Sequence, residues 1–219
     1  MTEFAGFSAA ALDFYEDLED DNSRIFWNAH REIYDREVRA PMIAMVAALE
    51  DEFGPAKIFR PHRDVRFSKD KTPYKTHQGA FVRTAERTGL YVQVDAAGIR
   101  TGAGWYDADA EFKRQFRAAV DDDRSGRALE RLVAEFESLG YVVDGDRVKT
   151  RPRGWDADHP RIDLLRHNTL SVGLHHGDPD WLRSGATLEH VRHDWRAFAP
   201  LLAWHTEHVS TPAALEKRR

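Results

Sequence analysis

A short basic segment is the part of this sequence whose residue types and spacing are best suited to chemistry. Residues 60–75 contain six cations and only two carboxylates, Asp64 and Asp70, within a chain of net charge -5. The segment therefore carries +4, and the other 203 residues together carry -9. An acidic protein needs a reason to keep like charges this close, and an anionic ligand is one such reason.

The function that this composition favours is the binding of a phosphorylated or carboxylated small molecule. The planar guanidinium of arginine binds such groups through two parallel hydrogen bonds, and lysine adds a less directional charge. Hydroxyl groups interleaved with the cations supply neutral donors. We expect ligand-binding residues at Arg60, Arg63, Arg66, Ser68, Lys69, Lys71, Tyr74 and Lys75, and at Arg153 in a later loop.

Titratable side chains in and beside the basic segment could also do acid–base chemistry. His77 follows the segment directly, and a histidine pKa near neutrality suits a general acid or base. Asp64, Asp70 and Tyr74 are the other catalytic candidates. The sequence leaves open whether the chain is an enzyme, and it indicates no cofactor.

Two other interpretations of the basic segment stay open. In one, the chain is a nucleic-acid-associated module whose cations follow the phosphates while Phe67 or Tyr74 stacks on bases. The acidic remainder of the chain places this interpretation second. In the other, the segment is a structural ion-pair network that fastens a long loop to the acidic helices. If residues 63–66 are extended, Asp64 and Arg66 point to the same side and can pair.

Histidines near the C-terminus are interpreted as exposed residues of a helix. His190 and His193, like His205 and His208, are three residues apart and share a helical face. Such pairs can bind zinc or nickel, but a solvated helix end produces the same spacing, so no metal site is predicted. The chain has no cysteine, which excludes cysteine-ligated metal centres and a thiol nucleophile.

Length and composition favour a soluble cytoplasmic protein without a membrane partner. A chain of 219 residues can bury a sizeable core without disulfides. No apolar run approaches the roughly 18 residues that a membrane-spanning helix needs. The N-terminal residues also lack the basic and apolar regions of a signal peptide. The oligomeric state is not indicated.

The elements expected around the basic segment are strands with helices on both sides. Apolar spacing predicts helices over residues 8–18, 24–39 and 41–53, with Ser8 as the first N-cap. Alternating patterns and short turns predict strands over residues 57–60, 79–83, 90–94 and 98–101. The basic segment then forms much of a long connection between two strands, which is a common place for function.

Helices return in the second half of the chain. One is expected to be capped by Asp107 or Asp109 and the next by Ser125. A small hairpin is predicted over residues 141–149. A last strand over residues 169–175 and a last helix over residues 187–208 complete the pattern. It predicts an α+β fold, an antiparallel β-meander in the middle flanked by N-terminal and C-terminal helices, in a single domain over residues 1–219.

The basic segment also carries a family resemblance. Residues 63–75 read Arg-Asp-Val-Arg-Phe-Ser-Lys-Asp-Lys-Thr-Pro-Tyr-Lys, and this string resembles the signature of the domain of unknown function 2461 family. The similarity extends over nearly the whole chain and includes Asn22, followed by the aromatic pair Phe26-Trp27, in the order opposite to the usual one. The resemblance implies a compact α+β domain and no established activity.

Overall fold

The described part of the chain folds as two compact units. The computed structural model describes residues 3–66 and 69–209. Unit 1 consists of Met1–Val82, Tyr91–Thr101 and His175–Asp194. Unit 2 consists of Arg83–Leu90, Gly102–Leu174 and Trp195–Arg219.

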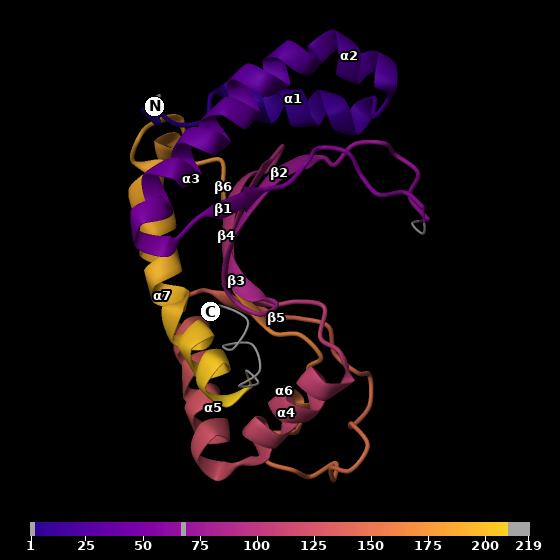
Figure 1. The fold of residues 1–219 in the computed structure, drawn as a ribbon, viewed down its shortest axis with the longest axis vertical. Coiled ribbons are helices and arrows are strands. Elements are labelled where there is room, and N and C mark those ends of the chain that lie inside the picture. Colours follow the sequence, from indigo (N-terminus) through magenta and orange to yellow (C-terminus); the bar gives the residue numbers. More distant parts are fainter. Residues whose placement is uncertain (1–2, 67–68, 210–219) are drawn as a thin grey trace, which may run out of the picture. The chain divides into compact units, whose positions relative to one another are not determined.

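Six strands form one sheet in the order β1-β2-β3-β4-β6-β5. Their bounds are β1 Ala56–Ile58, β2 His77–Ala85, β3 Thr88–Asp95, β4 Gly98–Trp105, β5 Val142–Asp144 and β6 Ser171–Gly177. Because β2, β3 and β4 are neighbours both in the chain and in the sheet, the predicted antiparallel meander is confirmed. Helices precede and follow the strands along the chain, which confirms the α+β class (Figure 1).

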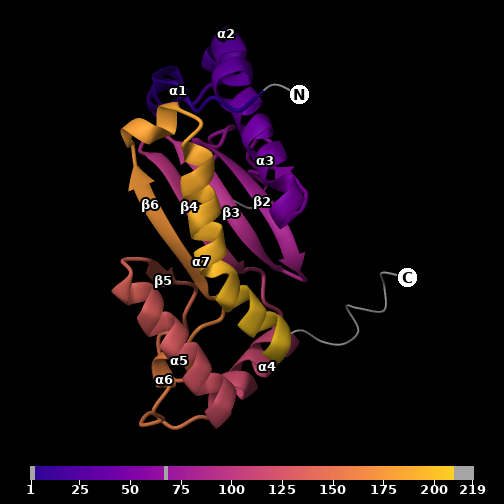
Figure 2. The same cartoon turned by 90° about the vertical axis from the view of Figure 1, so that its left-hand side faces the viewer.

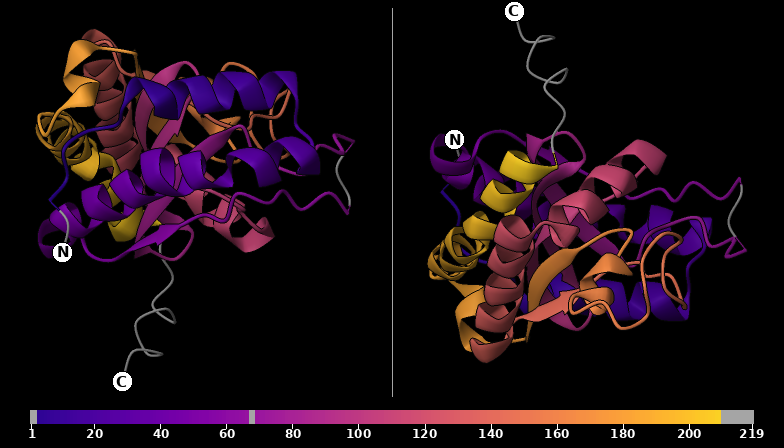
Figure 3. Two further views of the ribbon diagram at one scale, coloured as in Figure 1. Left: turned by 90° about the horizontal axis from the view of Figure 1, so that it is seen from above. Right: turned by 90° about the horizontal axis from the view of Figure 1, so that it is seen from below.

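Unit 1 begins with two helices that lie side by side, α1 Ala9–Asp20 and α2 Arg24–Ile33 (Figure 3). Ser23 caps α2, since its hydroxyl oxygen accepts a hydrogen bond from the Phe26 N–H at 3.1 Å. Ser8 precedes α1 as predicted but does not cap it with its side chain. Its hydroxyl instead donates to Glu37 Oε2 at 2.7 Å.

A π-helical segment, η1 Tyr34–Arg39, joins α2 to α3 Ala40–Phe53 without a break. The sequence predicted separate helices here, divided near Pro41. Right-handed helical backbone runs through the junction. Pro41 does not interrupt it, because the proline occupies the first turn of α3, where prolines are tolerated. The segment buries Tyr34, whose hydroxyl donates to Gln78 Oε1 on β2 at 2.6 Å.

The strands of unit 1 have one apolar face and one polar face. Buried Val82, Val92, Val94 and Ile99 belong to the apolar face. The helix α3 lies against one face of the sheet (Figure 2), and its C-cap Gly54 lies close to Val82, so this is the apolar face. The alternate positions of β2 and β3 turn the opposite way, because successive strand residues point to opposite faces. That polar face begins at His77, where β2 begins.

Unit 2 contains α4 Ala110–Asp121, α5 Asp123–Ser138 and the short α6 Ile162–Leu165. Asp109 caps α4 through the Phe112 N–H at 2.8 Å, in agreement with one of the two predicted caps. The predicted cap of α5 was wrong. Asp122 accepts hydrogen bonds from the N–H groups of Arg124 and Ser125, whereas the Ser125 hydroxyl donates to Ala119 O at 2.6 Å.

The hairpin predicted over residues 141–149 is also wrong. Only three of these residues form a strand, β5, and its partner is β6 rather than a neighbouring segment. The two strands run antiparallel, with Val143 opposite Val172. The Asp144-Gly145 pair suggested a local turn, but a pairing partner this far along the chain leaves no short-range signal.

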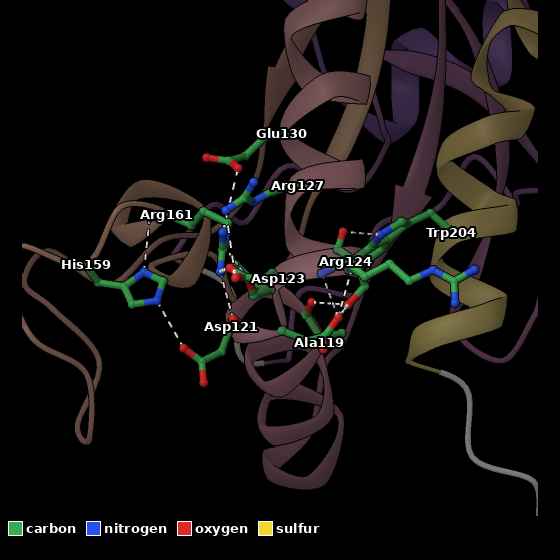
Figure 4. Close-up of polar contacts among 12 residues, drawn as sticks. Ala119, Asp121, Asp123, Arg124, Arg127, Glu130, His159, Arg161 and Trp204 are labelled. Atoms are coloured by element: carbon green, nitrogen blue, oxygen red, sulfur yellow. Dashed lines mark hydrogen bonds and ion pairs between the residues drawn. The ribbon is translucent and has the colours of Figure 1, made fainter.

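A buried arginine organises the loop that follows β5. The guanidinium of Arg161 donates to Val120 O and Asp121 O, both at 2.7 Å, and so satisfies the carbonyls of the last turn of α4. It also pairs with Asp123 at 3.1 Å (Figure 4). His159 Nδ1 accepts the Arg161 N–H at 3.0 Å, so a neutral His159 carries its proton on Nε2 and donates it to Asp121.

The last helix, α7 Thr187–His208, contains Pro200 and has nearly the bounds that the sequence predicts. A short 3-10 turn, η2 Asp180–Arg183, precedes it. None of the helices in the described ranges combines the length and the apolar character required to cross a lipid bilayer.

Candidate functional site at the base of the basic segment

The basic segment folds back on itself as a long hairpin between β1 and β2 (Figure 1). An isolated antiparallel bridge pairs His62 with Tyr74. On either side of it, the Arg63 N–H donates to Pro73 O at 2.9 Å and the Lys75 N–H donates to Pro61 O at 2.8 Å. These bonds fix the two ends of the segment side by side, so cations fifteen positions apart in the sequence become neighbours.

Tyr74 anchors this hairpin to α2. Asn22, just before the helix, accepts the Tyr74 N–H with Oδ1 and donates to Tyr74 O with Nδ2, each at 3.0 Å. The Tyr74 ring is 4% exposed and stacks on Trp27, with centroids 4.2 Å apart and an interplanar angle of 9°. The sequence predicted Tyr74 as a ligand-binding or catalytic residue, but its ring is buried against the protein.

Two arginines of the segment are paired with the segment's own carboxylates. Arg66 donates to both oxygens of Asp64, from Nε at 3.0 Å and from Nη2 at 2.7 Å. These bonds lower the pKa of the exposed Asp64 carboxyl to about 2. Arg63 pairs with Asp70. The ion-pair interpretation therefore has support within the loop itself, and the described partners are not the acidic helices.

Asp70 also shapes the backbone of the hairpin. Its Oδ1 accepts hydrogen bonds from the N–H and the hydroxyl of Thr72, at 2.9 and 2.8 Å. These bonds, together with the nearby Arg63, lower the pKa of the Asp70 carboxyl. Both carboxylates that the sequence offered for catalysis are thus engaged in holding the hairpin.

The remaining residues of the hairpin turn lie further from its base. Lys71 donates to Val65 O at 2.9 Å, and Lys69 is exposed. Phe67 and Ser68, predicted to stack and to bind, lie outside the described residues. Arg153 belongs to an exposed loop of unit 2.

A second group of cations gathers where the hairpin leaves the sheet. Within residues 3–66 and 69–209, Lys57, Arg60 and Lys75 form no direct ion pair with a carboxylate, although Arg60 is close enough to Asp64 to help lower its pKa. Lys75 is half-buried, and its Nζ lies 5.1 Å from the centroid of the Phe59 ring. Burial lowers the pKa of Lys75, and repulsion by Arg60, Arg63 and Lys57 lowers it further.

Arg63 connects the paired and unpaired groups of cations. One of its guanidinium nitrogens binds Asp70, and another lies 3.5 Å from Tyr74 O. Its Nε is buried and has no hydrogen-bond partner in the part of the chain that the structure describes. A buried donor left unsatisfied costs free energy, so Arg63 is held at the hairpin base at some energetic cost.

His77 begins β2 next to these cations. It is half-buried, and burial followed by the charge of Lys75 lowers its pKa, against an opposing effect of Asp95. The imidazole is therefore neutral at pH 7 and can accept a proton. Of the four catalytic candidates, Asp64, Asp70 and Tyr74 are engaged in contacts that hold the hairpin. His77 is the one that lies at the polar face of the sheet.

A hydrogen-bonded row of side chains continues this polar face along β3. The Tyr91 hydroxyl donates to Gln93 Oε1 at 2.7 Å, and Gln93 Nε2 donates to Asp95 Oδ2 at 2.6 Å. Tyr91 fits here because Gly79 on β2 has no side chain, and a Cβ at that position would lie 2.5 Å from the Tyr91 hydroxyl. Arg100 lies over the Tyr91 ring, 5.7 Å from its centroid.

Sequence reasoning missed several residues of this region. Lys57, Phe59 and Tyr91 carry no motif, and only the pairing of β1 with β2 and β2 with β3 brings them near the hairpin base. The role of Asn22 was signalled only by its place in the family resemblance. A pairing rule for the meander would have placed Lys57 beside β2, where it lies opposite Phe81.

The C-terminal histidines do not form a metal centre among the described residues, since no group of three or more suitable side chains converges there. The interpretation of His205 as exposed was wrong. It is 0% exposed and stacks on Trp105 and Phe112 within unit 2. Burial lowers the pKa of His205 to about 4.

Comparison with known proteins gives a family and no activity. A family model described as "Conserved hypothetical protein (DUF2461)" matches residues 10–204. The match covers most of the 219 residues, and the chain belongs to this family, as the resemblance of the basic segment indicated. No curated protein matches the chain.

Proposed function

We propose that this member of the family binds a small phosphorylated or carboxylated molecule at the base of the basic segment. The residues proposed to hold the anion are Lys57, Arg60 and Lys75, with Arg63 beside them. The observation that carries the proposal is the gathering of these cations without a direct ion pair from Lys57, Arg60 or Lys75 to a carboxylate in the described ranges. Like charges held together raise the free energy of the protein, and a bound anion relieves that repulsion.

The hairpin supports the proposal by making the site rigid. Asn22 and Trp27 hold Tyr74, so the neighbouring Lys75 is positioned by contacts that do not involve its own ammonium. Preorganised cations bind an anion more tightly, because less side-chain freedom is lost on binding. Arg66 and Lys71 are less suited to the ligand, because Asp64 and Val65 O already accept their donors.

The nucleic-acid interpretation has less support. It needs an aromatic ring free to stack on bases, and of its two candidate rings Tyr74 is stacked on Trp27 while Phe67 lies outside the described residues. A small anion needs no such ring.

The test is the thermal unfolding of the protein with inorganic phosphate and with a panel of phosphorylated and carboxylated metabolites, at constant ionic strength. A ligand of the native state raises Tm as its concentration exceeds Kd. Arg60→Gln and Lys75→Gln should each weaken the binding about tenfold, which corresponds to about 1.4 kcal/mol. Lys69→Gln, with the same loss of charge in the exposed part of the hairpin, should leave it nearly unchanged.

Two results would contradict the proposal. One is a panel in which no anion raises Tm. The other is an equal loss of affinity in Lys69→Gln and Lys75→Gln, because the anion would then be responding to net charge rather than to a site.

A further inference from the structure

Two aromatic rings lie side by side next to the proposed anion site. Phe59 follows β1 and Tyr91 belongs to β3, and their ring centroids are 6.3 Å apart at an interplanar angle of 35°. The Tyr91 ring reaches across β2, because a Cβ at Gly79 would lie between 2.5 and 3.0 Å from its hydroxyl and two ring carbons. Both residues are half-buried, so the two rings form a partly exposed aromatic floor.

A cation lies over each ring of this floor. Lys75 Nζ is 5.1 Å from the centroid of Phe59, and the guanidinium carbon of Arg100 is 5.7 Å from the centroid of Tyr91. Within the residues that the structure describes, neither cation forms a direct ion pair with a carboxylate. Lys75 belongs to the proposed anion site, whereas Arg100 is an exposed residue of β4. The floor therefore connects that site to a further cation.

Arg100 is positioned by contacts that leave some of its hydrogen-bond donors unused. Besides lying over the Tyr91 ring, it forms a hydrogen bond with the Tyr91 hydroxyl, which in turn donates to Gln93 Oε1 at 2.7 Å. The row ends at the carboxylate of Asp95, which accepts Gln93 Nε2 at 2.6 Å and the Ala97 N–H at 2.9 Å. The other N–H groups of a guanidinium suit a carboxylate or a phosphate.

We infer that the ligand of the proposed anion site carries a second acidic group, and that Arg100 binds this group. The inference rests on the proposed function, because Lys75 and its neighbours must hold the first acidic group. The carbon chain between the two groups would lie on Phe59 and Tyr91, which supply apolar contact. The class of ligand is therefore a molecule with an acidic group at each end, a phosphorylated carboxylic acid or a dicarboxylic acid.

The spacing of the two cations should then select the length of the ligand. Once the first acidic group is bound, the second one binds as part of the same molecule, and its effective concentration is highest when the chain matches the span. The contacts with the two rings restrict Lys75 and Arg100, so less side-chain freedom is lost when the ligand binds.

The probes are phosphonocarboxylic acids of increasing chain length, each compared with the alkylphosphonate of equal length at constant ionic strength. The alkylphosphonate has the same phosphonate and the same carbon chain, so the difference in Kd isolates the second acidic group. Titration calorimetry measures both. We expect one chain length at which the phosphonocarboxylic acid binds at least about tenfold more tightly than its partner.

Three variants assign the two ends of the ligand. Arg100→Gln should abolish the advantage of the phosphonocarboxylic acid and leave the affinity for the alkylphosphonate nearly unchanged. Lys75→Gln should weaken the binding of both series. Arg131→Gln is the matched control, because it removes the same charge from an exposed position of α5, and it should keep the advantage.

The outcomes separate this inference from the proposed function. Equal affinity of the two series at every chain length, in a protein that binds alkylphosphonates, would overturn the inference and leave the anion site standing. An equal loss of the advantage in Arg100→Gln and Arg131→Gln would also overturn it, because the second acidic group would then be responding to net charge. If neither series nor inorganic phosphate bound, the proposed function would fail and the inference with it.

Discussion

The side chain of Asn22 gives Tyr74 the two hydrogen bonds that a neighbouring strand would otherwise supply. Its amide group accepts from the N–H and donates to the carbonyl of the same residue. The amide has one donor end and one acceptor end, whereas the equally sized side chains of ionised Asp and of Leu lack the donor or both groups. The geometry of the hairpin base therefore depends on one residue 52 positions away in the chain.

Asn22→Asp tests this dependence. The carboxylate keeps the acceptor for the Tyr74 N–H but places an oxygen against Tyr74 O, so we expect a loss of about 1–3 kcal/mol in the free energy of unfolding. Urea unfolding at neutral pH measures it. Asn28→Asp, the same change at an exposed position of α2, is the matched control and should stay within about 0.5 kcal/mol of the parent. Equal losses in the two variants would mean that the added charge, not the lost pairing, is responsible.

Single residues of the site differ in how far the sequence could predict them. The Asp64–Arg66 pair was accessible because two residues of an extended segment share a side. The partner of Tyr74 was not, since a bond across 52 positions follows from the packing of α2 on the hairpin. The same reason hid the burial of Tyr74, which looks like any ligand-binding tyrosine when read among lysines.

At the scale of elements, the sequence predicted helices and strands well where the signal is local, but it did not predict pairings between distant segments. The meander and the start of α4 follow from turns and caps that lie within a few residues. The start of α5 was missed by one turn because Asp122 and Ser125 are both good capping residues, three positions apart. The strand β5 was assigned to a local hairpin because its partner β6 comes after the whole Arg161 loop.

Arg161 provides the test at this scale, because it joins the end of α4 to the start of α5. Arg161→Lys keeps the charge, but one ammonium cannot reproduce the fork that binds Val120 O and Asp121 O together. We expect a loss of about 2–4 kcal/mol, measured by chemical unfolding.

The control for that variant is Arg127→Lys. Arg127 is exposed and approaches Asp123 only at 3.8 Å, so the change should cost less than about 0.5 kcal/mol. If both variants lost the same small amount, the buried guanidinium would not be what holds the two helices together.

At the scale of the whole molecule, the net charge of -5 hides an uneven distribution. The sequence showed the basic segment within an acidic chain and indicated the Asp64–Arg66 pair, but it did not indicate that Arg63 pairs with Asp70. Arg63 and Arg66 pair with Asp70 and Asp64. The cations of the described residues left without a direct ion pair in this region are Lys69 and Lys71 in the exposed turn, Arg60 and Lys75 at the hairpin base, and Lys57 outside the segment. Because Lys75 is half-buried while Lys69 and Lys71 are exposed, the proposed anion site lies at the ends of the motif rather than in its middle.

The stability of the molecule should fall in mild acid because of His205. The Thr88 hydroxyl donates to Glu86 O and so accepts from His205 Nδ1, which leaves a neutral imidazole between two aromatic rings. Its pKa is about 4 in the folded protein against 6.5 normally. Between these values the unfolded state binds more protons, so the free energy of unfolding decreases as the pH falls from 6.5 to 4, by up to roughly 3 kcal/mol.

Urea unfolding across this pH range, for the parent protein and for His205→Gln, measures the effect. The variant should be less stable at neutral pH and should show a shallower decrease toward pH 4, with a remainder from His77 and His167, whose pKa values burial also lowers. Parallel curves for the two proteins would show that another group is responsible for the acid sensitivity.

The π-helical segment Tyr34–Arg39 joins α2 and α3 into one continuous helix, and it determines how α2 is rotated about the helix axis relative to α3. Each residue of an α-helix advances the chain by about 100° and 1.5 Å. A π-helix turns less per residue because its hydrogen bonds run from i to i+5, so the same six residues wound as plain α-helix would turn everything before them by roughly this angle about the axis. Trp27 would then face away from Tyr74, and the hairpin would lose its anchor although every residue of the basic segment was intact. The π-helical winding of this segment therefore sets the position of the proposed anion site.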